Sequence, residues 1–346
     1  MCRWFAYISD CESALLEDIL IRPQHSIVKQ VEQHWLPKLF HHVDKDTDKA
    51  TRADIAARNL HFNDDGTGVA FYSTVASEYG TAPHPLPQIY KTIMPPTNDI
   101  NFRSLCQNTC SKTVFAHVRM ATSEVHQFNN HPFAFGRHIF MHNGGVANFS
   151  QIRRGVCTKL SHKAFENIYG STDSEHLAAL YMTHLGDDWN EVYSLDEMKR
   201  ALERTIADVL DLQSKLPGAT NPLDASSLNL CTTDGFKLLA FRYRNADIEQ
   251  PPSLYISTKA GVTLNRKYPG HPNYWNDCDI PDDQALGFCG KDTLAAEEHG
   301  EHVIISSEPT TCQEDQWDLI PKNHAVMVEF AKGKAYLRTE PIVIPK

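Results

Sequence analysis

The chain has 346 residues, 41% of them hydrophobic, and carries a formal net charge of -10. This length suits one large domain or two ordinary ones, and the acidic balance, without any basic run, argues against binding to nucleic acid or to an anionic membrane. The nine cysteines show neither the spacing of a disulfide framework nor that of a zinc site, and no segment reaches the roughly 18 apolar residues of a membrane span, so we expect a cytoplasmic protein.

Predicted strands and helices alternate along the first half of the chain. Short runs of branched and aromatic residues indicate strands, and apolar residues at helical spacing indicate helices. We expect strands over residues 2–8, 66–73, 88–94, 113–119 and 137–143, and helices over 13–21, 25–34 and 147–160. The segment from Pro83 to Asp99 is rich in proline, which predicts a loop over the surface.

The second half of the chain is mostly predicted strands. Helical periodicity covers residues 195–216 and stops at Pro217-Gly218. Residues 267–283 are dense in Pro, Gly, Asn and Asp, so we expect a loop insertion there. No shift in composition marks a boundary, so we expect a single domain over residues 1–346, with two sheets packed together under helices. Strand-like alternation covers residues 228–233, 237–243, 254–258, 302–306, 325–330 and 334–338.

The N-terminus places a cysteine directly after the initiator, as Met1-Cys2. Initiator methionine is normally removed before a small residue, and its removal leaves Cys2 with both a thiol and a free α-amine. A thiol is a good nucleophile but is mostly protonated near neutral pH, whereas an α-amine titrates at about 7.7–8.0 and can accept that proton. One residue then supplies nucleophile and base together, although many chains begin Met-Cys without any catalytic purpose.

An arginine ends one of the predicted strands, in the run Phe115-Ala116-His117-Val118-Arg119-Met120-Ala121-Thr122. Its guanidinium offers a rigid fork that binds a carboxylate through two hydrogen bonds. An isolated arginine is as often a surface ion pair, so this run alone leaves both interpretations open.

A polar turn is predicted at Asn129-Asn130-His131-Pro132-Phe133. The imidazole of His131 either touches a substrate or, more commonly for such a histidine, satisfies nearby backbone groups.

Another predicted strand runs into a polar residue and two glycines, as Phe140-Met141-His142-Asn143-Gly144-Gly145. Glycine permits positive φ and lets a ligand come close to a backbone N–H. The Asn143 amide beside the Gly144 N–H supplies two donors aimed at one point, as an oxyanion hole requires. Taken alone, an Asn-Gly hairpin turn is the commoner interpretation.

A helix start is predicted at Gly170-Ser171-Thr172-Asp173-Ser174-Glu175, before an apolar run over residues 177–185. Thr172 and Glu175 have capping-box spacing. Asp173 then lies in the first turn, where the helix dipole stabilises an anion. It either helps the helix begin or receives a substrate ammonium, and spacing does not decide between these roles.

These five elements, in this order, resemble the class II glutamine amidotransferases, which are amino-terminal cysteine hydrolases. Further runs resemble one branch of the family, which holds the γ-glutamyl hydrolase subunit of the fungal cytosolic glutathione-degradation complex and the ergothioneine-pathway γ-glutamyl hydrolases. These runs are Met1-Cys2-Arg3-Trp4, Arg22-Pro23-Gln24-His25-Ser26-Ile27, Asp65-Gly66-Thr67-Gly68-Val69-Ala70-Phe71-Tyr72, and Ser306-Ser307-Glu308-Pro309 with Trp317.

The resemblance implies an α+β fold, the four-layer αββα sandwich of the Ntn hydrolases. It also implies the catalytic residues. Cys2 attacks the γ-carbonyl with its own α-amine as base, while Asn143 and the N–H of Gly144 hold the oxyanion. No metal or organic cofactor is implied.

The substrate-binding residues implied by the resemblance are Arg119 and Thr122 for the α-carboxylate of a glutamyl group and Asp173 for its α-ammonium, with His131 nearby. Many family members have Trp after the arginine and His-Gly after the threonine, whereas this chain has Met120 and Ser123-Glu124. Contacts made by those side chains do not transfer to this chain.

The resemblance thus implies a γ-glutamyl amidohydrolase that cleaves glutathione or a related γ-glutamyl compound through a thioester and releases glutamate. The alternative is a glutaminase subunit that supplies ammonia to a separate synthetase, since no Walker-type loop or other second site is visible in the sequence. The third hypothesis is a non-catalytic scaffold subunit, against which the complete set of candidate residues argues. A metallopeptidase-like protein is the implied partner.

Overall fold

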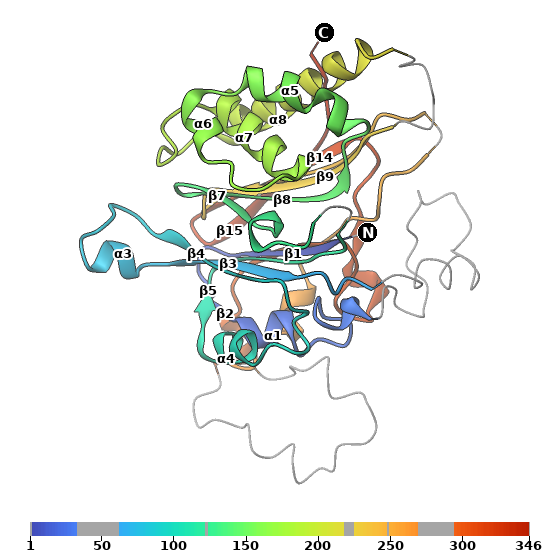
Figure 1. The fold of residues 1–346 in the computed structure, drawn as a ribbon. Helices are drawn as coiled ribbons and strands as arrows, with labels where there is room; N and C mark the ends of the chain where they lie inside the picture. The colour runs from blue at the N-terminus through green and yellow to red at the C-terminus, as the bar shows by residue number, and fades with distance from the viewer. Residues whose placement is uncertain are drawn as a thin grey trace.

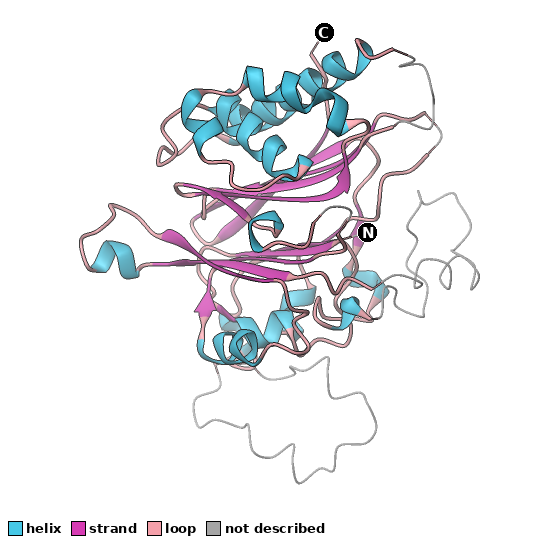
Figure 2. Ribbon diagram, in the orientation of Figure 1, coloured by secondary structure: helices cyan, strands magenta, loops and turns pink. Residues whose placement is uncertain are grey.

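The computed structural model describes residues 2–32, 62–121, 124–217, 225–247, 249–268 and 294–345. Within these ranges the chain forms four layers, with helices on the outside and two sheets face to face between them (Figure 1). Figure 2 shows how far helix and strand segregate into separate layers. The predicted four-layer αββα sandwich is therefore confirmed.

The first sheet contains seven strands, and the N-terminal strand lies at its centre. Its run Arg3–Ile8 is buried throughout, because a central strand packs on both faces. Phe5 and Tyr7 pack toward the outer helices, whereas Trp4, Ala6 and Ile8 pack toward the second sheet. In spatial order the strands are β13 (Asp318–Leu319), β11 (Tyr255–Ser257), β12 (Val303–Ser306), β1 (Arg3–Ile8), β6 (Thr113–Val118), β3 (Thr67–Ser73) and β4 (Leu86–Thr92).

The second sheet is also antiparallel and carries the candidate oxyanion segment on one of its inner strands. Its order is β15 (Lys334–Pro341), β14 (His324–Ala331), β10 (Leu238–Arg244), β9 (Ser227–Thr233), β8 (His138–Gly145) and β7 (Phe133–Phe135). A third, two-stranded sheet joins β2 (Ala14–Leu15) to β5 (Cys110–Ser111).

Three apolar clusters separate the layers. One lies between the two sheets, one between the seven-stranded sheet and its helices, and one between the six-stranded sheet and its helices. The helices over the six-stranded sheet are α5 (Phe149–Lys159), α6 (His162–Glu166), α7 (Asp173–Leu185) and α8 (Leu195–Ser214). The other α-helices are α1 (Leu16–Leu20), α3 (Val75–Glu78) and α4 (Ile100–Asn108), with 3-10 turns at Lys29–Val31, Gln127–Asn129, Ala260–Thr263, Ala296–Glu298 and Glu314–Gln316.

Most of the strands expected from the sequence are confirmed, including the strand predicted over 88–94, which overlaps β4. Two expectations need correction, and one helix was not predicted. The helix predicted over 25–34 is wrong within the described residues, where only the 3-10 turn Lys29–Val31 forms. The proline-rich loop predicted from Pro83 to Asp99 contains β4, and β4 tolerates proline because it is the edge strand of its sheet. Helix α4, capped by the Asp99 side chain, was not predicted.

The insertion predicted over 267–283 lies almost wholly outside the described residues. Of the helices that are described, none is both long enough and apolar enough to cross a bilayer.

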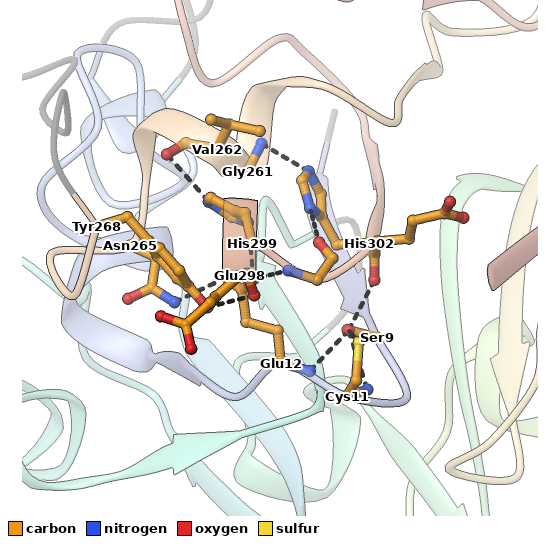
Figure 3. Close-up of polar contacts among 12 residues, drawn as sticks. Ser9, Cys11, Glu12, Gly261, Val262, Asn265, Tyr268, Glu298, His299 and His302 are labelled. Carbon is orange, nitrogen blue, oxygen red and sulfur yellow. Dashed lines mark hydrogen bonds and ion pairs between the residues drawn. The ribbon is translucent and has the colours of Figure 1, made fainter. Parts of the chain in front are cut away.

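A polar cluster fixes the chain just after β1, at the end of that strand opposite to Cys2 (Figure 3). The buried carboxylate of Glu12 accepts hydrogen bonds from Asn265 Nδ2 at 2.7 Å and from Gly300 N at 2.8 Å, and its Oε2 lies 2.7 Å from His299 Nδ1. The His302 ring accepts the Gly261 N–H at 2.9 Å. Segments about 250 residues apart in sequence are thereby joined around one carboxylate.

Candidate active site

Cys2 lies at the start of the central strand of its sheet, beside the end of β6. In the antiparallel β1–β6 ladder Arg3 is opposite Val118. Cys2, which directly precedes β1, therefore lies next to the segment that follows β6. The Cys2 Sγ lies 3.5 Å from Met120 O and accepts the Met120 N–H at 3.4 Å. Burial raises the pKa of the Cys2 thiol, so little thiolate forms near neutral pH and attack requires a nearby base.

A buried ionic network holds the backbone next to Cys2. Arg3 Nε contacts Glu308 Oε1 at 2.6 Å, and Glu308 Oε2 lies 2.6 Å from His25 Nε2. Arg3 also donates to Cys2 O at 3.1 Å. Burial opposes ionisation of Glu308, but Arg3 and His25 outweigh it and lower the pKa of that carboxyl. The network therefore fixes the strand that presents the thiol.

Asn143 and Gly144 lie within strand β8, not in a hairpin turn. Asn143 is opposite Asn229 and Gly144 is opposite Leu228 in the β8–β9 ladder. Gly144 has φ 148°, and a Cβ there would lie 1.8 Å from Ser227 O, so only glycine fits. The hairpin interpretation of this segment is therefore wrong.

The amide of Asn143 is buried, yet neither its Nδ2 nor its Oδ1 makes a hydrogen bond within the described residues. Buried amides are usually paired, so this amide, unpaired at both its oxygen and its nitrogen, is a candidate for binding a ligand. A donor in this state is what a developing oxyanion needs.

Arg119 follows β6, and neighbouring segments hold its guanidinium. Its Nη1 donates to Asn130 Oδ1 at 3.2 Å, and its Nη2 donates to Glu124 O at 3.1 Å. Asn130 is itself fixed, because its Nδ2 donates to Thr92 O at 2.7 Å. The predicted Asn-Asn turn thus orients the arginine, a role that the sequence alone did not reveal.

Asp173 is the first residue of α7, as the capping pattern predicted. Thr172 Oγ1 accepts the Glu175 N–H at 3.2 Å, while the Glu175 carboxylate reaches back to the N–H groups of Tyr169 and Gly170. The carboxylate of Asp173 accepts the N–H groups of Ser174 and Val146, both at 2.8 Å. Its orientation is therefore fixed, with acceptor capacity left for a cation.

A histidine that the sequence reasoning did not select joins the oxyanion strand to the first turn of α7. His142 Nδ1 lies 2.9 Å from Ser174 Oγ, and its Nε2 lies 3.2 Å from Ser227 O. Burial lowers the pKa of His142, so the neutral ring donates through Nε2 and accepts through Nδ1. Its place directly before Asn143 was the only signal in the sequence.

The predicted site residue His131 stacks on His117, with 4.1 Å between ring centroids. Neither of its ring nitrogens has a hydrogen-bond partner in the described part of the chain, and burial lowers its pKa well below the usual value. The ring lines the cavity described next as a neutral group.

One cavity of about 430 Å³ gathers most of the predicted site residues. It is lined by Cys2, Arg119, His131, Gly144 and Asp173, together with Met120, Asn129, His142, Gly145, Val146, Phe149, Ser150, Ser171, Thr172 and Ser174. Thr122, the remaining predicted residue of the clamp, lies outside the described residues. Among those that are described, no three potential metal ligands gather in one place.

Sequence comparison connects this cavity to a known family. Residues 52–246, more than half of the chain, match the family model described as glutamine amidotransferases class-II. Over 338 residues, which are 95% of this chain and 82% of the relative, the chain is 28% identical to the probable glutamine amidotransferase DUG3 of Saccharomyces cerevisiae.

Two solved structures share the fold. A glutamine aminotransferase class-II domain protein from Silicibacter pomeroyi has a TM-score of 0.58 at 21% identity, covering 99% of this chain and 100% of that one. An allosteric regulatory enzyme of purine biosynthesis has a TM-score of 0.50 at 13% identity, covering 99% of this chain and 50% of that one. By its family match and its Ntn-hydrolase fold, the chain belongs to the class II glutamine amidotransferases, a family of amide-cleaving enzymes.

Proposed function

We propose that this protein is an amino-terminal-cysteine amidohydrolase that cleaves the γ-glutamyl amide bond of glutathione or a related γ-glutamyl compound and releases glutamate. The observation that carries the proposal is the single cavity lined by Cys2, Arg119, Gly144 and Asp173. A nucleophile, an oxyanion donor and one group for each charge of a glutamyl α-carbon all face the same space.

The proposed reaction begins when Cys2 Sγ attacks the γ-carbonyl carbon. Its proton passes to the Cys2 α-amine, which removal of Met1 exposes, and the carbonyl oxygen gains a negative charge beside Asn143 Nδ2 and the Gly144 N–H. The C–N bond then breaks as the α-amine returns the proton to the leaving nitrogen. Water hydrolyses the resulting thioester and releases glutamate.

The charged groups of the cavity fit the proposed substrate. Arg119 suits an α-carboxylate because its fork makes two hydrogen bonds, and Asp173 suits an α-ammonium because its carboxylate is already oriented by Val146 and Ser174. In this proposal the glutamyl side chain reaches from these groups to Cys2 across the shared cavity, so the clamp contacts only the glutamyl half of the substrate.

Discrimination among γ-glutamyl amides must come from contacts to the leaving group, since every such amide shares the clamped half. We expect kcat/KM for a γ-glutamyl peptide such as glutathione to exceed that for glutamine. The relative in yeast is itself named only as a probable glutamine amidotransferase, so its name supports the amidotransferase class and leaves the amide open.

The alternative candidate is a glutaminase subunit that passes ammonia to a separate synthetase. The family match favours it, because the family is described by its use of glutamine. A partner protein enters both proposals, either a metallopeptidase-like protein or the ammonia-using synthetase.

A substrate panel decides between the two. Glutamine, glutathione and other γ-glutamyl amides are compared by kcat/KM, with and without a cell extract that supplies partners, and intact-mass analysis establishes whether Met1 is present. A preference for glutathione supports the hydrolase. A preference for glutamine under both conditions, with ammonia consumed by a co-purifying synthetase, would move the proposal to the glutaminase.

A further inference from the structure

A second cavity, of about 270 Å³, lies beside the catalytic cavity, and the two share no lining residue. The first turn of α7 divides them, since Asp173 lines the catalytic cavity and Glu175 lines the second one. The dividing wall is tightly packed, because a Cβ on Gly170 would lie 2.4 Å from Asn129 Oδ1 and 2.8 Å from Glu175 Oε2. The second cavity is lined by Ile89, Lys91, Gln127, Phe128, Phe133, Ala134, Phe135, Asn167, Tyr169 and Glu175.

Two opposite charges face this cavity without pairing with each other. Lys91 Nζ makes no hydrogen bond and no ion pair within the described ranges, and it contacts the face of the Phe133 ring, with its nitrogen 4.8 Å from the ring centroid. The Glu175 oxygens each accept one backbone N–H, from Tyr169 at 3.0 Å and from Gly170 at 2.6 Å. A carboxylate has about four lone-pair sites, so acceptor capacity remains.

Burial disfavours the charged form of both Lys91 and Glu175. Burial lowers the pKa of Lys91 to about 8, although Glu175 acts in the opposite direction. Burial likewise raises the pKa of Glu175, although two backbone N–H groups and Lys91 oppose it. A ligand that brings a carboxylate to Lys91 and an ammonium to Glu175 would compensate both charges at once.

The rest of the lining is apolar and aromatic. Phe128 and Tyr169 stack on each other, with 5.6 Å between centroids, and they remain 51% and 68% exposed. Phe133 and Phe135 are buried deeper in the cavity wall. Large exposed aromatic side chains beside a cavity are typical of a surface that covers an apolar ligand.

We propose that this cavity binds a free α-amino acid or a dipeptide with an apolar side chain, as a zwitterion. Its carboxylate contacts Lys91, its ammonium contacts Glu175, and its side chain packs among the Phe128, Phe133 and Tyr169 rings. The volume of about 270 Å³ lies just below the range of about 300–1,000 Å³ for drug-sized ligands, which suits a smaller ligand of this kind. This site is separate from the cavity at Cys2. The proposal does not depend on which amide the Cys2 cavity cleaves.

Calorimetric titration of the full-length protein with L-phenylalanine tests the proposal. Two probes each lack one charge, 3-phenylpropionate the ammonium and phenethylamine the carboxylate. We expect phenylalanine to bind at least tenfold more tightly than either probe. Lys91→Met should weaken phenylalanine binding at least tenfold, while Lys259→Met, which changes an exposed lysine outside both cavities, should leave it unchanged.

The glutamyl clamp also recognises an amino acid, so Asp173→Asn is the second control. Binding that Asp173→Asn abolishes and Lys91→Met spares would place phenylalanine in the catalytic cavity and overturn the proposal. Equal affinity for phenylalanine and 3-phenylpropionate would overturn it too, as would no binding at millimolar phenylalanine. Glu175→Gln should weaken binding as Lys91→Met does, but Glu175 also fixes the start of α7, so a folded Lys91→Met variant decides the outcome.

Discussion

The polar groups near the two ends of strand β1 differ in whether they have hydrogen-bond partners. Beyond the Ile8 end, the Glu12 carboxylate is surrounded by Asn265, His299 and the Gly300 N–H. At the Cys2 end, the amide of Asn143, which directly precedes the cavity-lining Gly144, is buried and has no partner in the described part of the chain.

The difference separates polar groups that hold the fold from polar groups kept ready for a ligand. A buried polar group without a partner costs about 1–3 kcal/mol. Folding alone gives no reason to keep Asn143 unpaired, whereas chemistry at Cys2 gives one. Removing a paired group should therefore lower stability, and removing the unpaired amide of Asn143 should lower activity.

The largest effect is expected from Cys2→Ala. It removes the nucleophile, so kcat should fall on the order of 10⁶-fold, as when a comparable nucleophile is deleted, while the melting temperature stays near that of the wild type. Cys11→Ala, at the other end of β1, is the matched control and should leave kcat unchanged. Mass spectrometry of the active enzyme should show a chain without Met1. Active protein that retains Met1 rules out the α-amine as base.

The next effect concerns Glu308, whose carboxylate pairs with Arg3 and His25 and so holds the Cys2 end of strand β1. Glu308→Gln removes the charge that pairs with buried Arg3 and His25. Loss of one member of a buried ionic network costs about 3–5 kcal/mol, so the midpoint of denaturant unfolding should drop clearly. We also expect kcat to fall, because Arg3 contacts the Cys2 carbonyl. Unchanged stability would mean that the network does not hold this strand.

Asn143→Ala should slow the chemistry without weakening the fold. Loss of one oxyanion donor costs roughly 10²–10³ in kcat, about 2.7–4 kcal/mol, with KM little changed. Because no protein hydrogen bond is lost, the free energy of unfolding should change by about 1 kcal/mol or less.

Asn265→Ala is the control for Asn143→Ala from the other end of β1. It removes the 2.7 Å hydrogen bond that Asn265 donates to Glu12 Oε1. The loss should cost about 1–3 kcal/mol of stability and leave kcat unchanged. If Asn143→Ala instead preserved kcat, the oxyanion assignment would fail.

Arg119→Lys should damage substrate binding, because one ammonium cannot reproduce a bidentate fork. We expect a loss of about 2 kcal/mol or more, roughly 30-fold in kcat/KM. Arg266→Lys, which changes a guanidinium that pairs with Asp18 outside the cavity, should leave kcat/KM unchanged.

Substrate analogues test the same clamp from the other side. Blocking the α-amine removes the group proposed for Asp173, and esterifying the α-carboxylate removes the group proposed for Arg119. Wild-type enzyme that hydrolyses both analogues as fast as the free compound has no such clamp.

Much of the fold was predictable because the strands show their burial in their composition. β1 reads as a continuous apolar run since both of its faces are buried. Proline content wrongly predicted a loop over all of Pro83 to Asp99, although the strand predicted over 88–94 overlaps β4, because the one proline of β4, Pro87, is tolerated at a sheet edge. Helix α4 was missed because its start signal, Asp99, follows a segment dominated by proline.

The candidate site was predictable where residues contact a substrate and poorly predictable where they contact one another. Cys2, Arg119 and Asp173 lie in motifs with local signals. Glu308 acts on Arg3 across 305 positions of sequence, and His142 acts on α7 across 32. No local pattern encodes such pairs, so only the fold reveals them.

The smallest effect concerns pH and the Glu12 end. Burial opposes ionisation of both groups, yet their contact raises the pKa of His299 and, with Asn265 and Gly300, lowers that of Glu12. The His299 contribution to stability is complete below its unfolded pKa of about 6.5 and is lost as pH rises through the folded value. The Glu12 contribution is complete above about 4.3 and is lost as pH falls through its folded value.

The stability difference between the wild type and His299→Gln should therefore be largest between about pH 4.3 and 6.5, at about 1 kcal/mol, and shrink on both sides. Denaturant unfolding at a series of pH values measures it. Burial lowers the pKa of His302, so His302 destabilises the fold as pH falls through about 6.5. This contribution is present in both proteins and cancels in the stability difference. The same substitution should leave kcat unchanged, because His299 lies at the end of β1 away from Cys2. A difference that stays flat across this range would show that the Glu12 pair adds no charge-dependent stability, and a changed kcat would contradict the separation between the two ends.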